Sequence, residues 1–346
     1  MIAGKKHRAS KVGQERWLRF KANKRGYYSL WIFSVLFIVS LFAEFVANDS
    51  PLLVWHDGKP FFPVVKDYPE TAFGGEFPAT ADYRDPYIKE LIREDGWMLW
   101  PPIRYSYNTI NYDLPSPAPS PPSAENPLGT DDRGRDVMAM VIYGFRISVL
   151  FGLCLTFGSS VIGVVAGAIQ GYYGGKIDIY GQRFIEIWSG MPTLFIIIIL
   201  ASVVQPTFWW ILLVTLLFGW IQLVGVVRAE FLRGRNFEYV QAAKAMGLTD
   251  PIIMFKHILP NAMIATLTFM PFILAGSITT LVSLDFVGFG LASGSPSLGE
   301  LVAQGKANVQ APWLGITAFV TLGSVLTLLV FIGEGVRDAF DPRKNY

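Results

Sequence analysis

Six stretches of this chain are long and apolar enough to cross the hydrocarbon core of a lipid bilayer. They cover approximately residues 27–47, 147–170, 186–205, 207–227, 264–288 and 314–334. A bilayer core about 30 Å thick requires about 20 apolar residues in a helix, whose backbone satisfies its own hydrogen bonds. The composition agrees, because 52% of the 346 residues are hydrophobic and only 16% are charged. We therefore predict an all-α membrane protein with six transmembrane helices.

Basic residues near the ends of these stretches indicate which side of the membrane each connection faces. The first 26 residues contain nine of them: Lys5, Lys6, Arg8, Lys11, Arg16, Arg19, Lys21, Lys24 and Arg25. Because lysine and arginine are retained on the inner side, residues 1–26, 228–263 and 335–346 are predicted to be cytoplasmic and 48–146 periplasmic. Both termini are therefore predicted to lie in the cytoplasm.

The first apolar stretch has two features that distinguish an anchor from a cleaved signal. Its apolar part is longer than a signal core, and no A-x-A site follows it, so we expect an uncleaved transmembrane helix over 27–47. The preceding residues 10–26 combine basic side chains with Trp17, Leu18 and Phe20. They are either an interfacial helix lying on membrane lipid or a simple basic anchor.

The chain contains no sequence pattern for chemistry of its own. The single cysteine, Cys154, excludes a disulfide or a cysteine-based zinc site. The segment 171–177, GYYGGKI, lacks the spacing and the Ser/Thr of an ATP-binding loop, and neither H-E-x-x-H nor G-x-S-x-G occurs. A net charge of +2 gives no reason to expect a nucleic-acid partner. We predict no catalytic residues, cofactor or metal in this chain.

The connection over 48–146 is long for a membrane protein. It is rich in proline and aromatic residues and has no sustained period of 3.6 or 2.0 residues, so we expect an irregular periplasmic loop. Near its end, Asp131-Asp132 are placed to cap a helix, and apolar residues then recur at three- and four-residue steps over 137–145. This predicts a short amphipathic helix lying along the outer surface.

Local signals within 147–334, the predicted core with five transmembrane helices, indicate how its helices pack and bend. Small residues at Gly152, Gly158, Gly163 and Gly167 favour close helix approach. Met191-Pro192 predicts a kink near the inner end of the third stretch. Residues 288–301 are too polar to face lipid, so we expect them either outside the membrane or buried in protein.

A polar, hinged segment over 238–261 separates the fourth and fifth apolar stretches. Good helix formers over 238–246 precede Gly247, which favours a left-handed helix end. Asp250 and Pro251 then fit an N-cap and first position of a second short helix, which Pro260 would end or redirect. Because alanine has almost no side chain, Ala242 and Ala243 would let a partner approach the backbone closely. We interpret the segment as a cytoplasmic docking surface.

The spacing of this segment resembles the EAA signature of ABC-importer permeases: E-A-A, three residues, G, nine residues, then I-x-L-P. This chain has Gln241-Ala242-Ala243, Gly247, and His257-Ile258-Leu259-Pro260 at matching positions, followed by Asn261. The resemblance implies that these residues dock into a cytoplasmic ATPase that binds ATP and Mg. Gln241 in place of glutamate and His257 in place of isoleucine depart from the signature. A histidine followed by Leu-Pro-Asn resembles the peptide and nickel branch.

Further motifs extend the resemblance over about 126–346. NPLGTDDRGRDV, YGFRISVL, GYYGGKIDIYGQR and GEGVRDAFDPR resemble C-subunit permeases of dipeptide and oligopeptide importers, and this resemblance implies a location in a bacterial inner membrane. The long outer loop with SLDFVGFGL and SPSLGEL resembles permeases of the Yej-type importers of peptides and microcin C. The resemblance implies the type I importer permease fold, a second permease subunit, a periplasmic substrate-binding protein and a peptide substrate.

Three ionisable residues are candidates for the outer end of the transport path. Asp285 near the outer end of the fifth stretch either lines the path or is an interfacial carboxylate. Arg135 and Asp136 match the family's outer motif and either help to close the path or form an ion pair within the loop. His257 is expected to pack within the docking segment, since no other histidine is spaced with it as a metal ligand.

Two other classes of protein are compatible with a membrane protein of this length. A sensor or scaffold whose outer loop binds a ligand without transport would have no need of an ATPase at 238–261. An intramembrane enzyme would need paired catalytic groups at membrane depth, and the sequence has none.

Overall fold

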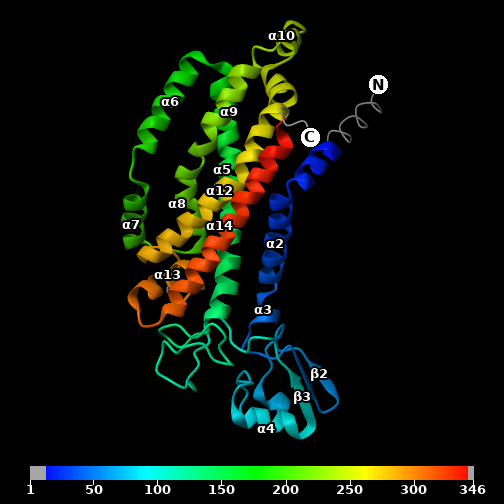
Figure 1. The fold of residues 1–346 in the computed structure, drawn as a ribbon, viewed down its shortest axis with the longest axis vertical. Helices are drawn as coiled ribbons and strands as arrows, with labels where there is room; N and C mark the ends of the chain where they lie inside the picture. The colour runs from blue at the N-terminus through cyan, green and yellow to red at the C-terminus, as the bar shows by residue number, and fades with distance from the viewer. Residues whose placement is uncertain (1–12, 293, 342–346) are drawn as a thin grey trace.

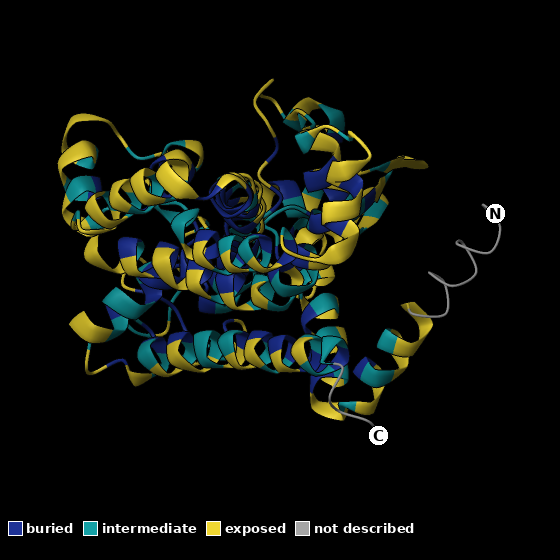
Figure 2. Cartoon of the chain, turned by 90° about the horizontal axis from the view of Figure 1, so that it is seen from above, coloured by how far each residue is buried: buried dark blue, intermediate teal, exposed yellow. Residues whose placement is uncertain are grey.

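Long helices running side by side dominate the computed structural model, which describes residues 13–292 and 294–341 (Figure 1). The bundle helices are α2 (Lys24–Leu41), α5 (Val137–Tyr173), α6 (Gly175–Ser189), α7 (Thr193–Val203), α8 (Phe208–Gly219), α9 (Ile221–Gly234), α12 (Leu259–Val287) and α14 (Pro312–Phe340). Shorter helices are α3 (Ala43–Val46), α10 (Glu238–Ala245), α11 (Asp250–Ile252) and α13 (Leu298–Ala307). Buried residues lie on the inward sides of the helices and exposed residues on the outside (Figure 2).

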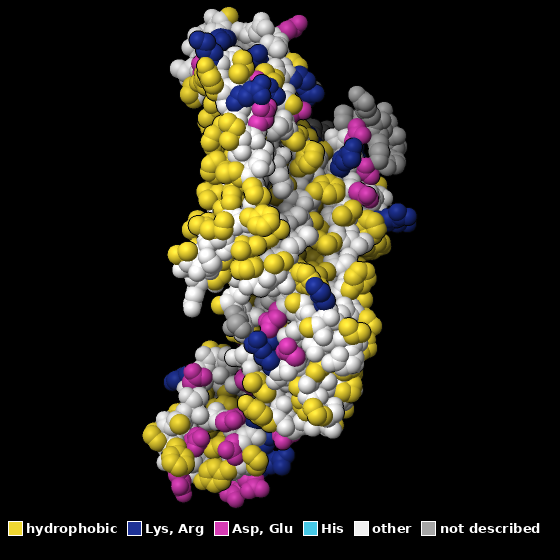
Figure 3. Space-filling model, turned by 90° about the vertical axis from the view of Figure 1, so that its left-hand side faces the viewer, with side chains coloured by type: hydrophobic (Ala, Val, Ile, Leu, Met, Phe, Trp, Pro, Cys, Tyr) yellow, Lys and Arg dark blue, Asp and Glu magenta, His cyan; other side chains and the backbone are white. Residues whose placement is uncertain are grey.

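Four of the described helical segments are long and apolar enough to cross a membrane: Val137–Tyr173, Phe208–Gly234, Asp250–Val287 and Pro312–Phe340. A fifth span exists if α6 and α7 count as one, because they are bent by 64° where Met191-Pro192 joins them. This bend confirms the kink predicted from Pro192. Hydrophobic side chains cover the middle of the molecule and charged ones gather toward its ends (Figure 3).

The helix at the first predicted span is shorter than the apolar stretch 27–47 and is interrupted near its end. Helix α2 has 18 residues and begins with Lys24 and Arg25, and a break at Phe42 separates it from α3. The six-span count therefore stays a prediction. Helix α2 packs along α14 at a close approach, where a Cβ on Gly26 would lie 2.9 Å from the Cα of Gly335. The basic segment before it, predicted over 10–26, is helical over 13–22.

Glycines bring α5 and α9 together backbone to backbone, as their pattern predicted. A Cβ added at Gly163 or Gly167 would lie 2.6 Å and 2.7 Å from the carbonyl oxygens of Trp220 and Val224. Gly171 continues this row one turn later, against the carbonyl oxygen of Arg228 at 2.5 Å. Any larger side chain on this row would push the two helices apart.

The prediction of an irregular outer loop is wrong for residues 53–99, which fold into a small subdomain. Strands β1 (Leu53–His56), β2 (Lys59–Phe61) and β3 (Gly96–Leu99) form an antiparallel sheet in the order β2-β1-β3, with Trp55 opposite Trp97. The 3-10 helix η1 (Glu70–Phe73) and α4 (Pro86–Asp95) cover it. Their core contains Val54, Phe73, Ala81, Tyr83, Ile88 and Ile92. The strands are three or four residues long, which is too short to show a period.

The predicted surface helix before the second span is also wrong. Residues 137–145 are the first turns of α5, a continuous helix of 37 residues. Asp136, and not Asp131-Asp132, is its N-cap, and its side chain accepts a hydrogen bond from the Ala139 N–H at 2.7 Å. Val137 and Met140 are buried, because they share a hydrophobic core with Leu298 and Leu301 of α13 and Leu314 of α14.

The second half of the polar segment over 288–301 is buried in protein, which is one of the two predicted placements, whereas Gly288 and Ala292 in its first half are exposed. Its second half forms the start of α13, which packs against α5, α12 and α14. Ser297, Leu298 and Leu301 are buried there. The outer subdomain and α13 lie at one end of the bundle, and α10 lies at the other (Figure 1).

Candidate functional site

The segment that resembles a docking surface folds as two short helices joined by a tight turn. Helix α10 ends at Met246, and Gly247 adopts the left-handed conformation with φ +80°, as predicted. The Leu248 N–H donates to the Ala243 carbonyl at 3.2 Å and the Gly247 N–H to the Lys244 carbonyl at 3.0 Å. These two bonds satisfy carbonyls that the helix end would leave unpaired.

Two details of the turn differ from expectation. Thr249, not Asp250, is the residue that precedes α11, and Asp250 is its first helical residue. Pro260 does not end the second helix, since a π-helical turn, η2 (Ile253–Ile258), leads directly into α12. The wider turn accommodates a proline, which has no N–H to donate and whose ring clashes with an ordinary helical carbonyl.

A separate hydrophobic core holds this segment against the ends of the long helices. Val240 and Ala243 of α10 pack with Ile253 and Ile258 of η2, and with Val227 and Phe231 of α9. Ala243 is therefore buried, and the expectation that both alanines face a partner is wrong. Of these two alanines Ala242 is exposed, as is the neighbouring Gln241.

Polar contacts brace the segment further. The Tyr172 hydroxyl at the end of α5 donates to the Asp250 carboxylate at 2.6 Å. Tyr239 of α10 donates to the His257 carbonyl at 3.4 Å and accepts from the Asn261 side chain at 3.2 Å. His257 is half-buried and Leu259 packs on the core, while Pro260 and Asn261 are exposed. In the described part of the chain, no three His, Cys, Asp or Glu side chains form a group able to hold a metal ion.

The exposed side of the segment presents three apolar side chains. Met246 is 75% exposed, Phe255 65% and Ile252 44%. They come from the turn, from α11 and from η2, at the end of the bundle opposite the outer subdomain. Apolar side chains held outward by a braced segment are typical of a protein interface.

The bond between Tyr172 and Asp250 leads to a testable expectation for the rigidity of this segment. Tyr172→Phe removes the side-chain hydrogen bond to Asp250, and loss of a hydrogen bond to a charged group costs about 1.5–3 kcal/mol. We expect faster amide hydrogen exchange in α10 and α11, measured by mass spectrometry. Tyr180→Phe is the control, because Tyr180 is 71% exposed on α6. Unchanged amide exchange in Tyr172→Phe would show that this hydrogen bond does not stabilise the segment.

A cavity of about 670 Å³ lies between α5, α7, α8 and α12, at the level of the apolar spans. Its polar lining consists of hydroxyl groups and one amide: Ser159, Thr193, Thr215, Gln222, Ser277, Thr279, Thr280 and Ser283. No Asp, Glu, Lys or Arg is among its lining residues. Such a surface suits a polar, uncharged stretch of ligand.

Two of the threonines in the cavity are arranged as acceptors. Thr280 and Thr279 donate to the carbonyls of Gly276 and Ala275 at 2.9 Å, one turn back in α12. A hydroxyl that donates to its own helix keeps its oxygen lone pairs for another group. The buried Ser159 hydroxyl has no protein partner in the described structure. Sequence analysis missed this set, although Ser277, Thr280 and Ser283 recur every three residues in an apolar helix.

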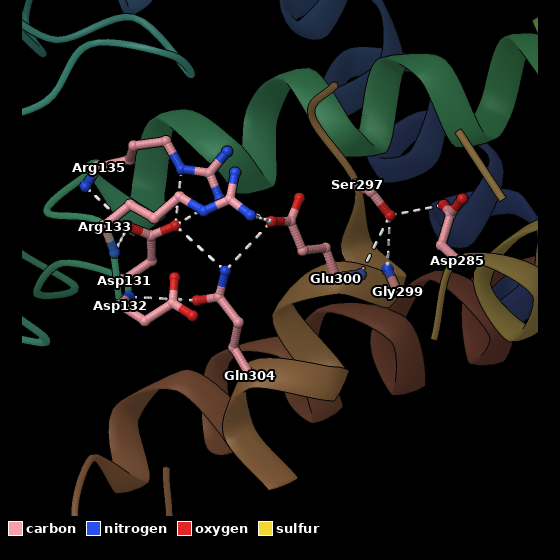
Figure 4. Close-up of polar contacts among 9 residues, drawn as sticks. All are labelled: Asp131, Asp132, Arg133, Arg135, Asp285, Ser297, Gly299, Glu300 and Gln304. Atoms are coloured by element: carbon pink, nitrogen blue, oxygen red, sulfur yellow. Dashed lines mark hydrogen bonds and ion pairs between the residues drawn. The ribbon is translucent and has the colours of Figure 1, made fainter. Parts of the chain in front are cut away.

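An ionic network joins the loop that precedes α5 to α13 (Figure 4). Arg135 donates through Nε to Asp131 at 2.7 Å and through a guanidinium NH₂ group to Glu300 of α13 at 2.8 Å. Gln304 donates to the same Asp131 oxygen at 3.2 Å. Burial opposes the charge of Arg135, but its ion pairs with Asp131 and Glu300 outweigh this and raise its pKa. Arg135 thus forms an ion pair within the loop, but with Asp131 and not with Asp136, and a second ion pair with Glu300. Sequence analysis identified neither Asp131 nor Glu300 as its partner.

Asp136 and Asp285 hold local structure on either side of this network. Asp136 caps α5 and accepts from Asn126 at 2.8 Å, and burial raises the pKa of its carboxyl group. Asp285 accepts from the Leu291 N–H at 2.7 Å and from the Ser297 hydroxyl at 2.5 Å. Both of its oxygens are therefore engaged by the loop before α13, and it is absent from the lining of the hydroxyl cavity.

Apolar spans, a hydroxyl-lined cavity between them and a braced docking segment at one end are the features of a membrane permease. Residues 159–346 match the family described as binding-protein-dependent transport system inner membrane component. Residues 12–63 match the N-terminal TM domain of oligopeptide transport permease C. The chain belongs to this family of inner membrane transport components, which confirms the resemblance found in the sequence.

Several relatives are similar over most of their length. The inner membrane ABC transporter permease protein YejE of Escherichia coli K12 is 64% identical over 337 residues, which are 97% of this chain and 99% of that protein. The peptidoglycan transport system permease protein YejE of Agrobacterium fabrum C58 is 56% identical, over 97% and 94%. The oligopeptide transport system permease protein OppC of Haemophilus influenzae Rd is 34% identical, over 69% and 77%.

One solved structure with a similar arrangement is an inward-facing form of the MetNI methionine ABC transporter. The match covers 58% of this chain and 97% of the chain in that structure, with a TM-score of 0.49 and 17% sequence identity.

Proposed function

We propose that the chain is the permease subunit of an ATP-driven importer that moves peptides or peptide-like molecules, including microcin C-type compounds, from the periplasm to the cytoplasm. The names of its relatives support this, since they are an ABC transporter permease, a peptidoglycan transport permease and oligopeptide permeases. In this proposal the chain has six spans, with both termini and the segment 238–261 in the cytoplasm.

The observation that carries the proposal is the exposed apolar tip formed by Met246, Ile252 and Phe255. These side chains lie on a segment that packs on α5, α9 and α12, so a force applied to the tip is transmitted to three long helices. A cytoplasmic ATPase that binds ATP and Mg would dock here and drive the change between inward-open and outward-open states. A sensor or scaffold would not require such a braced tip.

The hydroxyl cavity supports a peptide-like substrate. Peptide main chain offers N–H donors, and the cavity offers uncharged acceptors such as Thr279 and Thr280. Both of these threonines are exposed in the single chain, so a second permease would complete the wall of the path. A periplasmic binding protein would deliver the substrate at the end that holds the outer subdomain.

Gly247→Val tests the proposal. Nothing lies within 4 Å of an added Cβ at Gly247, but φ +80° is strained for valine at a cost of about 1–3 kcal/mol, so the turn is expected to rearrange. We expect ATP-dependent peptide uptake into proteoliposomes that contain the assembled importer to fall about tenfold. Gly225→Val is the matched control, since Gly225 also has free space but lies within helix α9. Equal uptake by both variants would refute a coupling role for this segment.

A further inference from the structure

A groove of about 780 Å³ lies where the outer subdomain meets the segment 102–126. Four basic side chains line it: Arg84, Lys89, Arg93 and Arg104. Lys89 and Arg93 are one turn apart on α4, beside the face whose Ile88 and Ile92 pack into the subdomain core. The groove is thus built on a folded element and not on a loop alone.

The gathering of cations in this groove contrasts with the charge around it. Residues 48–125 contain twelve Asp and Glu but only six Lys and Arg, and four of those six line the groove. Acidic side chains are prominent on the subdomain surface in Figure 3. Within the described ranges 13–292 and 294–341, none of the four cations has an ion-pair partner within 4.0 Å. The concave surface therefore carries cations that no ion pair within 4.0 Å neutralises in the described ranges.

Two carboxylates, Asp113 and Glu125, also line the groove and reduce its positive charge without cancelling it. Glu125 accepts a hydrogen bond from the Tyr105 hydroxyl at 3.1 Å. Burial and this bond raise the pKa of Tyr105 to about 12, so its phenol adds no charge.

Aromatic rings hold two of the arginines in place. The Arg84 guanidinium lies 4.4 Å from the ring centre of Tyr105, and that of Arg104 lies 5.8 Å from the ring centre of Trp100. Stacking on a ring orders a guanidinium and leaves its N–H groups free to donate in the plane. Planar donors of this kind match the two oxygens of a carboxylate.

Hydrogen bonds connect the groove to the membrane helices. Asn111 and Asn126 line it, and the Asn111 side chain donates to Asn126 at 3.2 Å. Asn126 in turn donates to Asp136, the N-cap of α5. A ligand in the groove would therefore lie three side chains from the start of the longest bundle helix.

We propose that this groove binds the carboxylate groups of an acidic peptide at the outer face, before the peptide reaches the cavity between the helices. The inference rests on the proposed function, which it deepens by naming the substrate class. A small acidic ligand fits better than the surface of a protein, because Arg84 and Lys89 are half-buried in the walls of the groove. Free anions share this chemistry and are separated from the peptide by the test.

The test measures binding to the assembled transporter in lipid nanodiscs, without ATP and without the binding protein. The probe is a fluorescent tripeptide with two glutamates and a free C-terminus, and its comparator has glutamines and an amidated C-terminus. The altered protein carries Lys89→Gln and Arg93→Gln, which keep good helix formers in α4. The matched control carries Lys59→Gln and Lys66→Gln, which remove the same charge from the subdomain outside the groove.

We expect the groove variant to bind the acidic probe at least about tenfold more weakly, as loss of charge-assisted bonds predicts. The control is expected to bind it normally, and 0.5 M salt to weaken wild-type binding. Equal binding by the groove variant and the control overturns the proposal. The proposal is also overturned if inorganic phosphate displaces the acidic probe as strongly as the unlabelled acidic peptide does. That result would indicate a simple anion site.

Two further measurements separate this inference from the proposed function and from a protein-docking site. If the proposed import function is wrong, neither the wild-type protein nor any variant takes up peptide. Binding of the probe to the groove is measured directly, so this inference is tested even then. If the groove variant loses affinity for the soluble binding protein but not for the acidic probe, the groove is a protein-docking site and the proposal is wrong. Unchanged uptake of the neutral comparator with reduced uptake of the acidic probe supports the proposal.

Discussion

Arg135→Met is expected to destabilise the outer end of the bundle by about 3–5 kcal/mol, the cost of leaving a buried charge without its partner. Asp131 is 0% exposed, and Arg135 supplies two of its bonds and also holds Glu300 of α13. Without the guanidinium, two carboxylates are left close together in a largely buried site. The measurements are the apparent melting temperature of the purified protein and the rate of proteolysis within 126–136.

The double variant Asp131→Asn/Arg135→Met tests whether charge or packing causes this loss. Removing both charges leaves no buried carboxylate at position 131, so part of the lost stability is expected to return. Arg183→Met is the control, because Arg183 forms an exposed pair with Glu186 on α6, for which a small effect is expected. A double variant as unstable as Arg135→Met would contradict the electrostatic explanation.

Met246→Asp/Phe255→Asp is expected to abolish assembly with the ATPase, with at least about a hundredfold loss of affinity. Two apolar side chains that are 75% and 65% exposed would be buried in that interface, and burial of an unpaired carboxylate costs several kcal/mol. Co-purification of the ATPase with the tagged permease measures the loss.

Phe77→Asp/Tyr112→Asp is the matched control for this variant. Both residues are well exposed, at 63% and 86%, and lie in the outer segment, so they add the same two charges away from α10. We expect the control to retain the ATPase. Retention by Met246→Asp/Phe255→Asp as well would show that the apolar tip is not the docking surface.

The features that sequence analysis predicted correctly depend on near neighbours in the chain. Proline at 192 bends a helix because it lacks an N–H and carries a ring, and the bend of 64° lies there. Glycine at 247 favours a left-handed helix end because it has no Cβ, and φ is +80°. The close approach of α5 to α9 follows from glycines four residues apart, which lie on one face of any helix.

The features that were missed depend on residues far apart in the sequence. The pair of Arg135 with Glu300 joins positions 165 residues apart, and no local pattern indicates it. The sequence predicts that Pro260 ends or redirects a helix, but the π-helical turn before it leads directly into α12. The sequence predicts an irregular loop where the outer subdomain lies, because its strands are too short to show alternating apolar and polar residues.

The amino-acid sequence by itself determined the membrane character of the chain, its apolar helices and the spacing of the segment 241–261, because hydrophobicity and backbone preference act locally. Tertiary structure alone decided which alanine of that segment faces outward, that Met246 and Phe255 form its tip, and that four cations meet in one groove. These arrangements depend on how helices and subdomain pack in three dimensions, and packing joins side chains whose separation in the sequence carries no periodic signal.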